Sequence, residues 1–314
     1  MCPINCSGLA IFSLRTEMLH PLTIFHRKTL RGILNLSKNA TIPAIHFLLG
    51  ELPIEAQIHI DVFALFFNIW RNPDTKIHKI VKYLLENSED NSRTWSIHMK
   101  HLSIKYNIED PLTCLRRDHP EKSRYKEYIK TKISAYHENN LRLSAKTNSK
   151  MTYMNVSLAG LRGRPHPALS GQLTSKDVKN SRIHLKMLVG DYMTYSIRAS
   201  QSGGSPHCRC CSSQLSEDLL HILTFCNAYT DIRNKLLPEY KNLCLKTRIP
   251  INFDDISSQD PILCQFILDP SSCNLKVRVN ISDPILDTFF KLSRDFCNAI
   301  NKKRMEIIRA KEVD

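Results

Sequence analysis

Four residues between positions 208 and 226 combine the side-chain types and the spacing of a structural zinc site. They are Cys208, Cys211, His221 and Cys226, in the pattern C-x2-C-x9-H-x4-C. A structural zinc ion is held by four ligands in a closed tetrahedron, and three cysteines with one histidine are a standard set. Two cysteines that are two residues apart can bind one ion from a single tight turn. The spacing therefore predicts one zinc ion held by these four side chains.

A helix has to carry the histidine back to the two cysteines. Ser216 has the side chain of a good N-cap, and the acidic Glu217 and Asp218 would lie in the first turn, where the helix dipole favours negative charge. We therefore expect a helix to begin at Ser216 and to present His221, with Cys226 near its end folding back to the ion. Three leucines would seat this helix on the rest of the protein: Leu219, Leu220 and Leu223.

Cys210 leaves the ligand set ambiguous, because a C-x-C arrangement with Cys208 is also possible. The two-residue gap between Cys208 and Cys211 is the usual zinc spacing and favours that pair. The other interpretation is that these cysteines are buried free thiols, since cysteine is often buried. Four of the eleven cysteines fall within 19 residues beside a suitably placed histidine, and this clustering favours a metal. The later cysteines are scattered singly and offer no second pair for a two-ion RING-type module.

Positive charge is concentrated immediately before the cysteine cluster. The formal net charge is +14, and residues 122–186 contain fourteen basic residues against three acidic ones, a net charge of +11. Concentrated positive charge favours polyanions, and the nucleic-acid backbone is the first candidate. An ordinary basic surface would have the same composition, so the composition alone does not separate the two.

Six basic residues in this segment are the candidate nucleic-acid contacts. Four of them recur every three to four residues on a helix predicted to begin at Thr174 or Ser175 and to end at Gly190. The other two lie in a loop marked by glycine and proline. The stripe on the helix is Lys176, Lys179, Arg182 and Lys186, and the loop residues are Arg162 and Arg164. A basic stripe that leads into a zinc site is a stronger nucleic-acid signal than either feature alone.

The apolar pattern elsewhere predicts a mainly α protein: an N-terminal helical bundle followed by a small zinc-stapled helical domain. Helices are expected from Ile54 to Asn72, over residues 77–85, 95–106 and 121–143, from near Pro111, over 229–237, and from Ser282 onward. Residues 153–158 are expected as a short strand, and 238–260 as a polar connection. The apolar stripe of the second helix is expected in the core: Ile77, Ile80, Val81, Leu84 and Leu85.

These elements suggest five segments along the chain. Residues 1–20 have no clear pattern, 21–150 form a helical domain, and 151–174 form an irregular linker. Residues 175–240 hold the basic helix and the zinc site, and 241–314 form a C-terminal helical extension. No run of 18 apolar residues and no signal-peptide pattern is present, so we expect no membrane association and a reducing cytoplasmic or nuclear environment.

Several segments in order resemble the C-terminal part of non-LTR (LINE-type) retrotransposon reverse transcriptases. They are residues 25–34, 50–53, 163–169, 177–194, 203–211, 221–226, 233–239 and 265–269. The resemblance covers the chain from about Pro21 to its end. It implies a zinc-knuckle region of CCHC type that binds RNA or DNA and follows a polymerase domain.

The catalytic residues of that family are missing, so the resemblance implies a non-catalytic fragment. Its polymerases hold magnesium with an aromatic-x-Asp-Asp turn, whereas Phe253-Asp254-Asp255 lacks the intervening residue and follows the zinc site. No endonuclease motif is present either. The chain is therefore expected to bind RNA or DNA through a zinc-containing module without catalysis. The alternative is a protein-interaction module in which zinc is only a staple.

Overall fold

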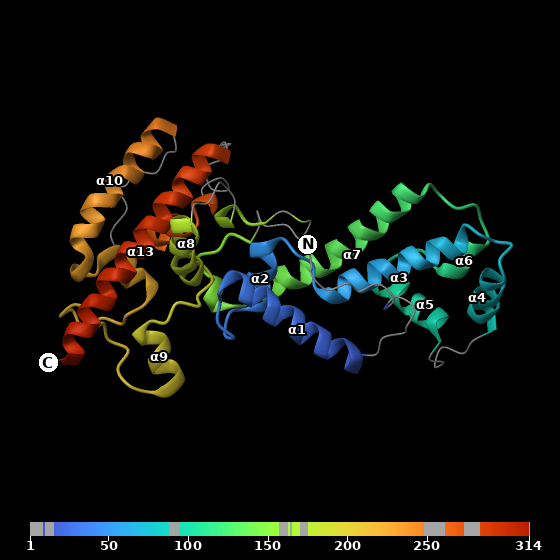
Figure 1. Cartoon of the computed structure of the whole chain (residues 1–314), viewed down its shortest axis with the longest axis horizontal. Coiled ribbons are helices and arrows are strands. Elements are labelled where there is room, and N and C mark those ends of the chain that lie inside the picture. Colours follow the sequence, from blue (N-terminus) through green and yellow to red (C-terminus); the bar gives the residue numbers. More distant parts are fainter. Residues whose placement is uncertain are drawn as a thin grey trace. The chain divides into compact units, whose positions relative to one another are not determined.

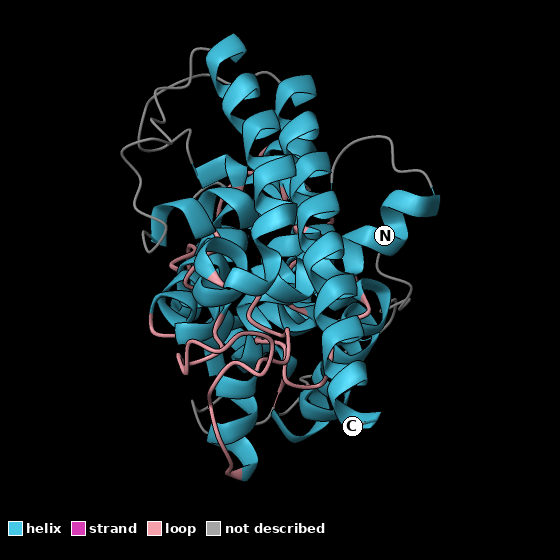
Figure 2. Ribbon diagram, turned by 90° about the vertical axis from the view of Figure 1, so that its left-hand side faces the viewer, coloured by secondary structure: helices cyan, strands magenta, loops and turns pink. Residues whose placement is uncertain are grey.

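The computed structural model describes residues 9, 16–87, 94–156, 163, 165–169, 175–247, 261–272 and 283–313. Within these residues the regular structure is helical and contains no strand, which confirms the predicted mainly α class (Figure 2). The α-helices are α1 (Thr16–Leu34), α2 (Ile42–Leu49), α3 (Ile54–Trp70), α4 (Lys76–Asn87), α5 (Trp95–Tyr106), α6 (Pro111–Leu115), α7 (Lys122–Lys146), α8 (Ser175–Leu188), α9 (Tyr195–Ser202), α10 (Thr230–Thr247), α11 (Pro261–Leu268) and α13 (Asp283–Val313).

The chain divides into two compact units. The N-terminal unit contains residues 1–29 and 51–143, and the C-terminal unit contains residues 30–50 and 144–314. The described residues among 30–50, 151–174 and 241–314 therefore belong to the same unit as the cysteine cluster. No single helix among the described residues is long and apolar enough to cross a membrane, although α2 and α3 reach the required length and composition as a consecutive pair.

The core of the N-terminal unit is built from aromatic and aliphatic side chains of α3, α5 and α7. On α3, Phe63 and Phe66 are fully buried. The ring of Phe67 stacks on Tyr125 of α7 with centroids 4.9 Å apart, and Trp70 meets Tyr125 edge-on at 5.7 Å. These contacts make α3 the central helix of this unit.

Helix α4 departs from the prediction that its whole apolar stripe is buried. Val81 and Leu85 are buried, but the side chains of Ile77 and Ile80 are 60% and 56% exposed. His78, Val81 and Leu85 form the buried face of α4, whereas Ile77 lies at the edge of that face and Ile80 points away from it. The prediction was wrong for these two isoleucines because the apolar residues of α4 surround more of the helix than the core can cover.

In the C-terminal unit, α13 packs along both α8 and α10 (Figure 1). It contributes the fully buried Phe289, Phe296 and Ile300. The buried Tyr240 of α10 donates its hydroxyl hydrogen to Ser293 Oγ at 3.0 Å, which adds a polar contact to the apolar core. The last predicted helix is confirmed and runs to Val313.

Helix α10 is longer than predicted. It continues through Pro238 to Thr247, where a polar connection was expected. A proline inside a helix removes one hydrogen bond. Tyr240 and Cys244, which follow it, are nevertheless buried, and this packing outweighs the loss. The strand predicted for residues 153–158 is not formed at residues 153–156. Residues 157 and 158, like Phe253-Asp254-Asp255, lie outside the described part of the chain.

A buried carboxylate joins the expected linker to the C-terminal core. Asp269 Oδ2 lies 3.4 Å from His166 Nε2, and both side chains are fully buried. The same carboxylate accepts hydrogen bonds from the amide of Asn155 at 2.7 Å and from the hydroxyl of Ser271 at 2.5 Å. His166 Nδ1 accepts the amide hydrogen of Ala168 at 3.2 Å. Asp269 therefore fixes two segments from residues 151–169 against the end of α11.

We predict that Asp269→Asn lowers the free energy of unfolding by about 2 kcal/mol, because a neutral amide cannot replace the charged acceptor of these buried hydrogen bonds. Burial alone would raise the pKa of Asp269, but His166 and the hydrogen bonds lower it. The carboxylate's contribution is thus present above the pKa of an unfolded aspartate, about 3.9, and is lost as the pH falls through the lower folded-state pKa. Urea denaturation between pH 2 and 7 measures both effects.

The matched control for this prediction is Asp231→Asn on α10, where the carboxylate is 65% exposed. It should change the unfolding midpoint little at any pH. Equal destabilisation by the two variants, or an unchanged acid transition in Asp269→Asn, would contradict the anchoring role.

Candidate metal centre

The four predicted ligands converge on one point. One ligand atom from each of Cys208, Cys211, His221 and Cys226 lies within 4.8 Å of the others. The sulfurs of Cys208 and Cys226 are 3.9 Å apart, and Cys211 Sγ lies 3.4 Å from His221 Nε2. A tetrahedral zinc ion with bonds of about 2.3 Å to sulfur and 2.0 Å to nitrogen has edges of about 3.8 Å and 3.5 Å. The cluster thus has the dimensions to hold a metal ion.

A short hairpin presents the first two cysteines. The antiparallel bridge between His207 and Ser216 closes it, with the amide of Cys208 donating to the carbonyl of Leu215 at 2.9 Å. Within the turn, the amide of Cys210 donates to Cys208 Sγ at 3.4 Å. An amide hydrogen bond to sulfur stabilises the thiolate, which is the form that binds a metal.

The helix that carries His221 begins later than predicted. Asp218 is its N-cap, because Asp218 Oδ1 accepts the amide hydrogen of His221 at 2.7 Å. Ser216 is instead engaged in the hairpin bridge, so its prediction as N-cap was wrong by two residues. Both residues have capping side chains, and the hairpin, which pairs Ser216 with His207 nine residues earlier, leaves Asp218 as the cap.

A turn of π-helix, labelled η4 (His221–Phe225), aligns the last two ligands. The amide of Cys226 donates to the carbonyl of His221 at 2.8 Å, five residues back. This wide turn brings both side chains to the same side. Ile222 and Leu223 are fully buried beneath it, so the turn is seated on the core as expected. π-Turns inside helices are rare and occur frequently at functional sites.

Cys210 does not share the four-ligand cluster. It forms a second group with Cys208 and Glu217 in which the ligand atoms also lie within 4.8 Å of one another. That group has three members, and its carboxylate is already bound to an arginine, as described below. The predicted choice of Cys208 with Cys211 is therefore favoured over the C-x-C alternative.

The thiols compete for ionisation in the absence of a cation. Hydrogen bonds from Cys210 and Cys226 lower the pKa of the Cys208 thiol. The pKa of Cys226 is raised, because its proton is shared with Cys208 and because the group is buried. Burial alone would lower the pKa of His221, but hydrogen bonds with Cys208 and Cys211 raise it. A bound cation would allow all three sulfurs to ionise, with release of protons.

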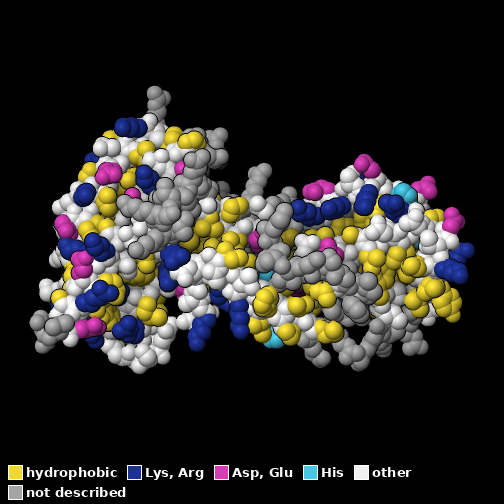
Figure 3. Space-filling view, viewed as in Figure 1, with side chains coloured by type: hydrophobic (Ala, Val, Ile, Leu, Met, Phe, Trp, Pro, Cys, Tyr) yellow, Lys and Arg dark blue, Asp and Glu magenta, His cyan; other side chains and the backbone are white. Residues whose placement is uncertain are grey.

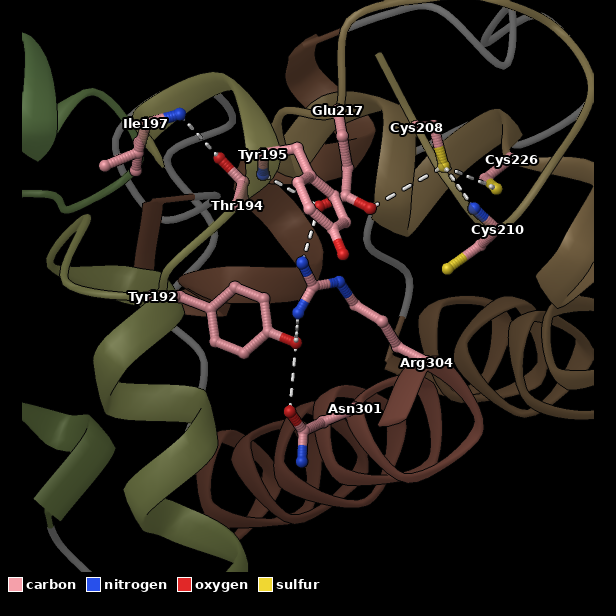
Figure 4. Close-up of polar contacts among 10 residues, drawn as sticks. All are labelled: Tyr192, Thr194, Tyr195, Ile197, Cys208, Cys210, Glu217, Cys226, Asn301 and Arg304. Atoms are coloured by element: carbon pink, nitrogen blue, oxygen red, sulfur yellow. Dashed lines mark hydrogen bonds and ion pairs between the residues drawn. The ribbon is translucent and has the colours of Figure 1, made fainter. Parts of the chain in front are cut away.

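A buried ion pair supports the hairpin from behind (Figure 4). Glu217 is fully buried, and its Oε1 accepts a hydrogen bond from Arg304 of α13 at 2.6 Å and one from the amide of Tyr195 at 2.9 Å. Its Oε2 lies 3.7 Å from Cys208 Sγ. The guanidinium of Arg304 also lies over the rings of Tyr192 and Tyr195, at 5.4 and 5.6 Å. Glu217 thus links a metal ligand directly to α13.

This pair was not predicted from the sequence, although one signal was present. Glu217 was expected in the first turn of a helix, where the helix dipole favours negative charge. Arg304 follows Ile300 by four residues, and Ile300 follows Phe296 by four, so Arg304 continues the buried face of α13. Burying a charged side chain on an apolar helix face is unfavourable unless it is paired with an opposite charge. Glu217 is the partner of Arg304.

The structure describes only part of the predicted basic stripe. Arg182 is exposed on α8 and Lys186 is partly exposed. Lys176 and Lys179 lie in α8, but their side chains are outside the described set, as are Arg162 and Arg164. Leu185, Leu188 and Val189 face the core as predicted, so the described part of the stripe lies on the opposite side of α8 from its apolar contacts.

Comparison with known protein families, curated proteins and solved structures finds no match to this chain. The functional argument therefore rests on the geometry of its own residues.

We predict that the purified chain contains one zinc ion and that Cys226→Ser loses it, because a tetrahedral site without one thiolate binds zinc far more weakly. Elemental analysis after extensive dialysis gives the stoichiometry. Cys210→Ser is the matched control, since it removes a neighbouring thiol outside the four-ligand cluster. Retention of zinc by Cys226→Ser, or its loss from Cys210→Ser alone, would overturn the ligand assignment.

A second prediction concerns the supporting ion pair. Arg304→Met should destabilise the metal-loaded protein by about 3 kcal/mol, because it leaves the buried Glu217 without its partner. Adding Glu217→Gln to this variant should restore part of the loss, since the uncompensated charge is gone. Denaturant unfolding followed by circular dichroism measures all three proteins.

The control for this series is Lys303→Met, at the neighbouring position of α13. Lys303 pairs with Asp231, which is largely exposed, so its removal should have little effect. If Lys303→Met and Arg304→Met were equally destabilised, the buried pair would have no special role.

Proposed function

We propose that this chain is a nucleic-acid-binding module held together by one structural zinc ion. It would correspond to the non-catalytic C-terminal region of non-LTR retrotransposon reverse transcriptases. The observation that carries the proposal is the closed cysteine–histidine cluster. It lies in the same packed unit as the basic side chains of Lys186 and Arg198, which are at least partly exposed and form no ion pair with any described residue.

Zinc is the metal that best fits the donor set. Three thiolates and one imidazole are soft or borderline ligands, which suit zinc rather than magnesium or calcium. All four tetrahedral positions would be filled by protein side chains, so no position is left for water or substrate. A closed site of this kind acts as a structural staple. The proposed function is therefore binding without catalysis.

Basic side chains without acidic partners occur in both units. In the N-terminal unit, Lys122, Lys126 and Lys130 are exposed and recur every fourth residue along α7. Figure 3 shows Lys and Arg side chains along the edge of this unit where α7 lies. In the C-terminal unit, Lys186 and Arg198 are at least partly exposed. Within the described residues, no carboxylate lies within 4.0 Å of any of these five, and Asp61 interacts with Lys126 only at longer range.

Such cations favour a nucleic-acid ligand for an electrostatic reason. A polyanion that displaces counterions gains free energy at each neutralised phosphate, and this gain needs cations that are not already paired. Contacts of this kind position a protein on the backbone without reading sequence. The module is therefore proposed to bind RNA or DNA with strong dependence on salt and weak dependence on sequence.

A second candidate function is a zinc-stapled protein-interaction module. The observation in its favour is the apolar outer face of α4, where Ile77, Ile80 and Tyr83 are 60%, 56% and 65% exposed. Figure 3 shows hydrophobic side chains gathered at the end of the N-terminal unit where α4 lies. Contiguous exposed apolar residues on a soluble protein often mark a contact surface.

The salt dependence of binding separates the two candidates. We predict that replacing the four stripe residues with glutamine reduces the slope of log K against log salt by about 0.7 to 0.9 for each lost phosphate contact. Folding should be nearly unaffected, since surface substitutions usually change stability by less than about 0.5 kcal/mol. Fluorescence anisotropy with single-stranded RNA and duplex DNA between 50 and 300 mM salt measures the slope; this range is chosen to bracket roughly physiological conditions.

The control removes four other exposed basic residues of the same unit: Lys235, Lys246, Lys291 and Arg309. If the salt slope fell equally in both variants, the stripe residues would contribute to binding only through the net charge of the protein. A wild-type chain that binds neither RNA nor DNA would contradict the proposal and would make the protein-interaction module the leading account.

A further inference from the structure

A cavity of about 430 Å³ lies in the C-terminal unit between the end of α8, α9 and α13. Its volume falls in the usual range of small-molecule sites, roughly 300 to 1,000 Å³. The cavity, called here the basic pocket, has polar and apolar walls. Its lining includes three cations, Lys150, Lys186 and Arg198, and three apolar side chains, Met193, Ile197 and Met305.

The end of α8 fixes the position of Lys150 in this pocket. Gly190 has φ +66°, its amide donates to Met187 O at 3.2 Å, and the amide of Asp191 donates to Lys186 O at 2.8 Å. This is a Schellman cap, which requires a left-handed residue and favours glycine. A Cβ atom at Gly190 would lie 2.4 Å from the carbonyl oxygen of Lys150. The close approach therefore holds Lys150 against the end of α8.

The acidic side chain of the basic pocket has hydrogen-bond partners, whereas the three cations named above form no ion pair with any described residue. Its carboxylate, Asp191, accepts hydrogen bonds from the amide of Ser37 at 2.7 Å and from the Ser37 hydroxyl. Lys150 Nζ donates only to a backbone carbonyl, that of Asn39, at 3.3 Å. Among the residues the structure describes, no acidic group lies within 4.0 Å of Lys186 or Arg198. The pocket thus presents positive charge that its own residues do not neutralise.

Arg304 also lines the pocket but adds no net charge to it, because the buried Glu217 neutralises its guanidinium. The guanidinium has a second partner in the hydroxyl of Tyr192, at 3.5 Å. Of the apolar lining, Met193 and Met305 are 40% and 37% exposed. Thioether side chains are polarisable and adapt to flat rings. The lining thus offers cations to an anion and thioethers to an apolar group.

We propose that the basic pocket binds a single nucleotide, with the phosphate on Lys150, Lys186 and Arg198 and the base against Met193, Ile197 and Met305. The combination of an anion and a flat apolar ring in one molecule is the chemistry of a nucleoside phosphate. A nucleotide within a bound RNA or DNA strand would supply it, and in this respect the proposal rests on the proposed function. A free nucleotide has the same chemistry and is the other source.

The test measures binding of adenosine 5′-monophosphate, adenosine and inorganic phosphate to the zinc-loaded full chain by calorimetry. We expect the monophosphate to bind more tightly than either of its parts. Lys186→Gln with Arg198→Gln should weaken it at least about tenfold, as expected for the loss of one charge-assisted hydrogen bond. Met305→Trp, which fills part of the pocket without changing charge, should weaken it similarly.

The matched control is Lys235→Gln with Lys246→Gln, which removes two exposed charges of α10 and should leave binding unchanged. Thermal unfolding verifies that each variant is folded. Failure of the monophosphate to bind the wild type, or equal binding by the pocket variants and the control, would overturn the proposal.

A labelled single-stranded RNA distinguishes the two sources. Competition between this RNA and the monophosphate, lost in Met305→Trp, would place a nucleotide of the strand in the pocket. The other outcome is that all variants bind RNA equally while the pocket variants no longer bind the monophosphate. That result would support the proposed nucleotide site and would assign it to a free nucleotide. RNA that does not bind at all would contradict the proposed function, whereas the monophosphate result would still decide the pocket.

Discussion

The C-terminal unit depends on one buried ion pair, that between Glu217 and Arg304. A fully buried carboxylate is unfavourable unless a cation and hydrogen-bond donors surround it, and here Arg304 and the amide of Tyr195 do so. Because Glu217 also touches Cys208, the cysteine hairpin, the start of α9 and the long helix α13 meet at one carboxylate. The hairpin has little apolar surface of its own, so this contact and the metal ligands together determine its position.

This arrangement explains how the cysteine hairpin, which has almost no regular secondary structure, can adopt one conformation. The hairpin bridge pairs its backbone, the sulfurs of Cys208 and Cys226 lie 3.9 Å apart, and Arg304 of α13 pairs with its buried Glu217. Metal binding of this kind contributes folding free energy directly. Lys186 of α8 and Arg198 of α9 line the same pocket as Arg304, the partner of this carboxylate. In the proposed account, zinc therefore does no chemistry on a ligand and instead holds a binding surface in shape.

Much of this structure could be predicted from local patterns. Ligand spacing identified the four side chains that converge in the cluster, and apolar periodicity identified α3, α5, α8 and α13. The errors occurred where a tertiary or hairpin pairing decides between local options. Two capping residues, Ser216 and Asp218, are equivalent until the hairpin engages one of them. Pro238 is tolerated only because the helix beyond it packs on α13, and the burial of Arg304 depends on a partner 87 residues away. A single sequence contains no direct information on such pairings.

The most direct test of the account is X-ray absorption spectroscopy at the zinc edge on the purified chain, with and without RNA. The account predicts a shell of three sulfurs at about 2.3 Å and one nitrogen at about 2.0 Å, unchanged when RNA is added, because all four positions belong to the protein. A shell with fewer than three sulfurs would contradict it. So would an oxygen ligand that is exchanged on RNA binding, since that would mean an open site rather than a closed staple.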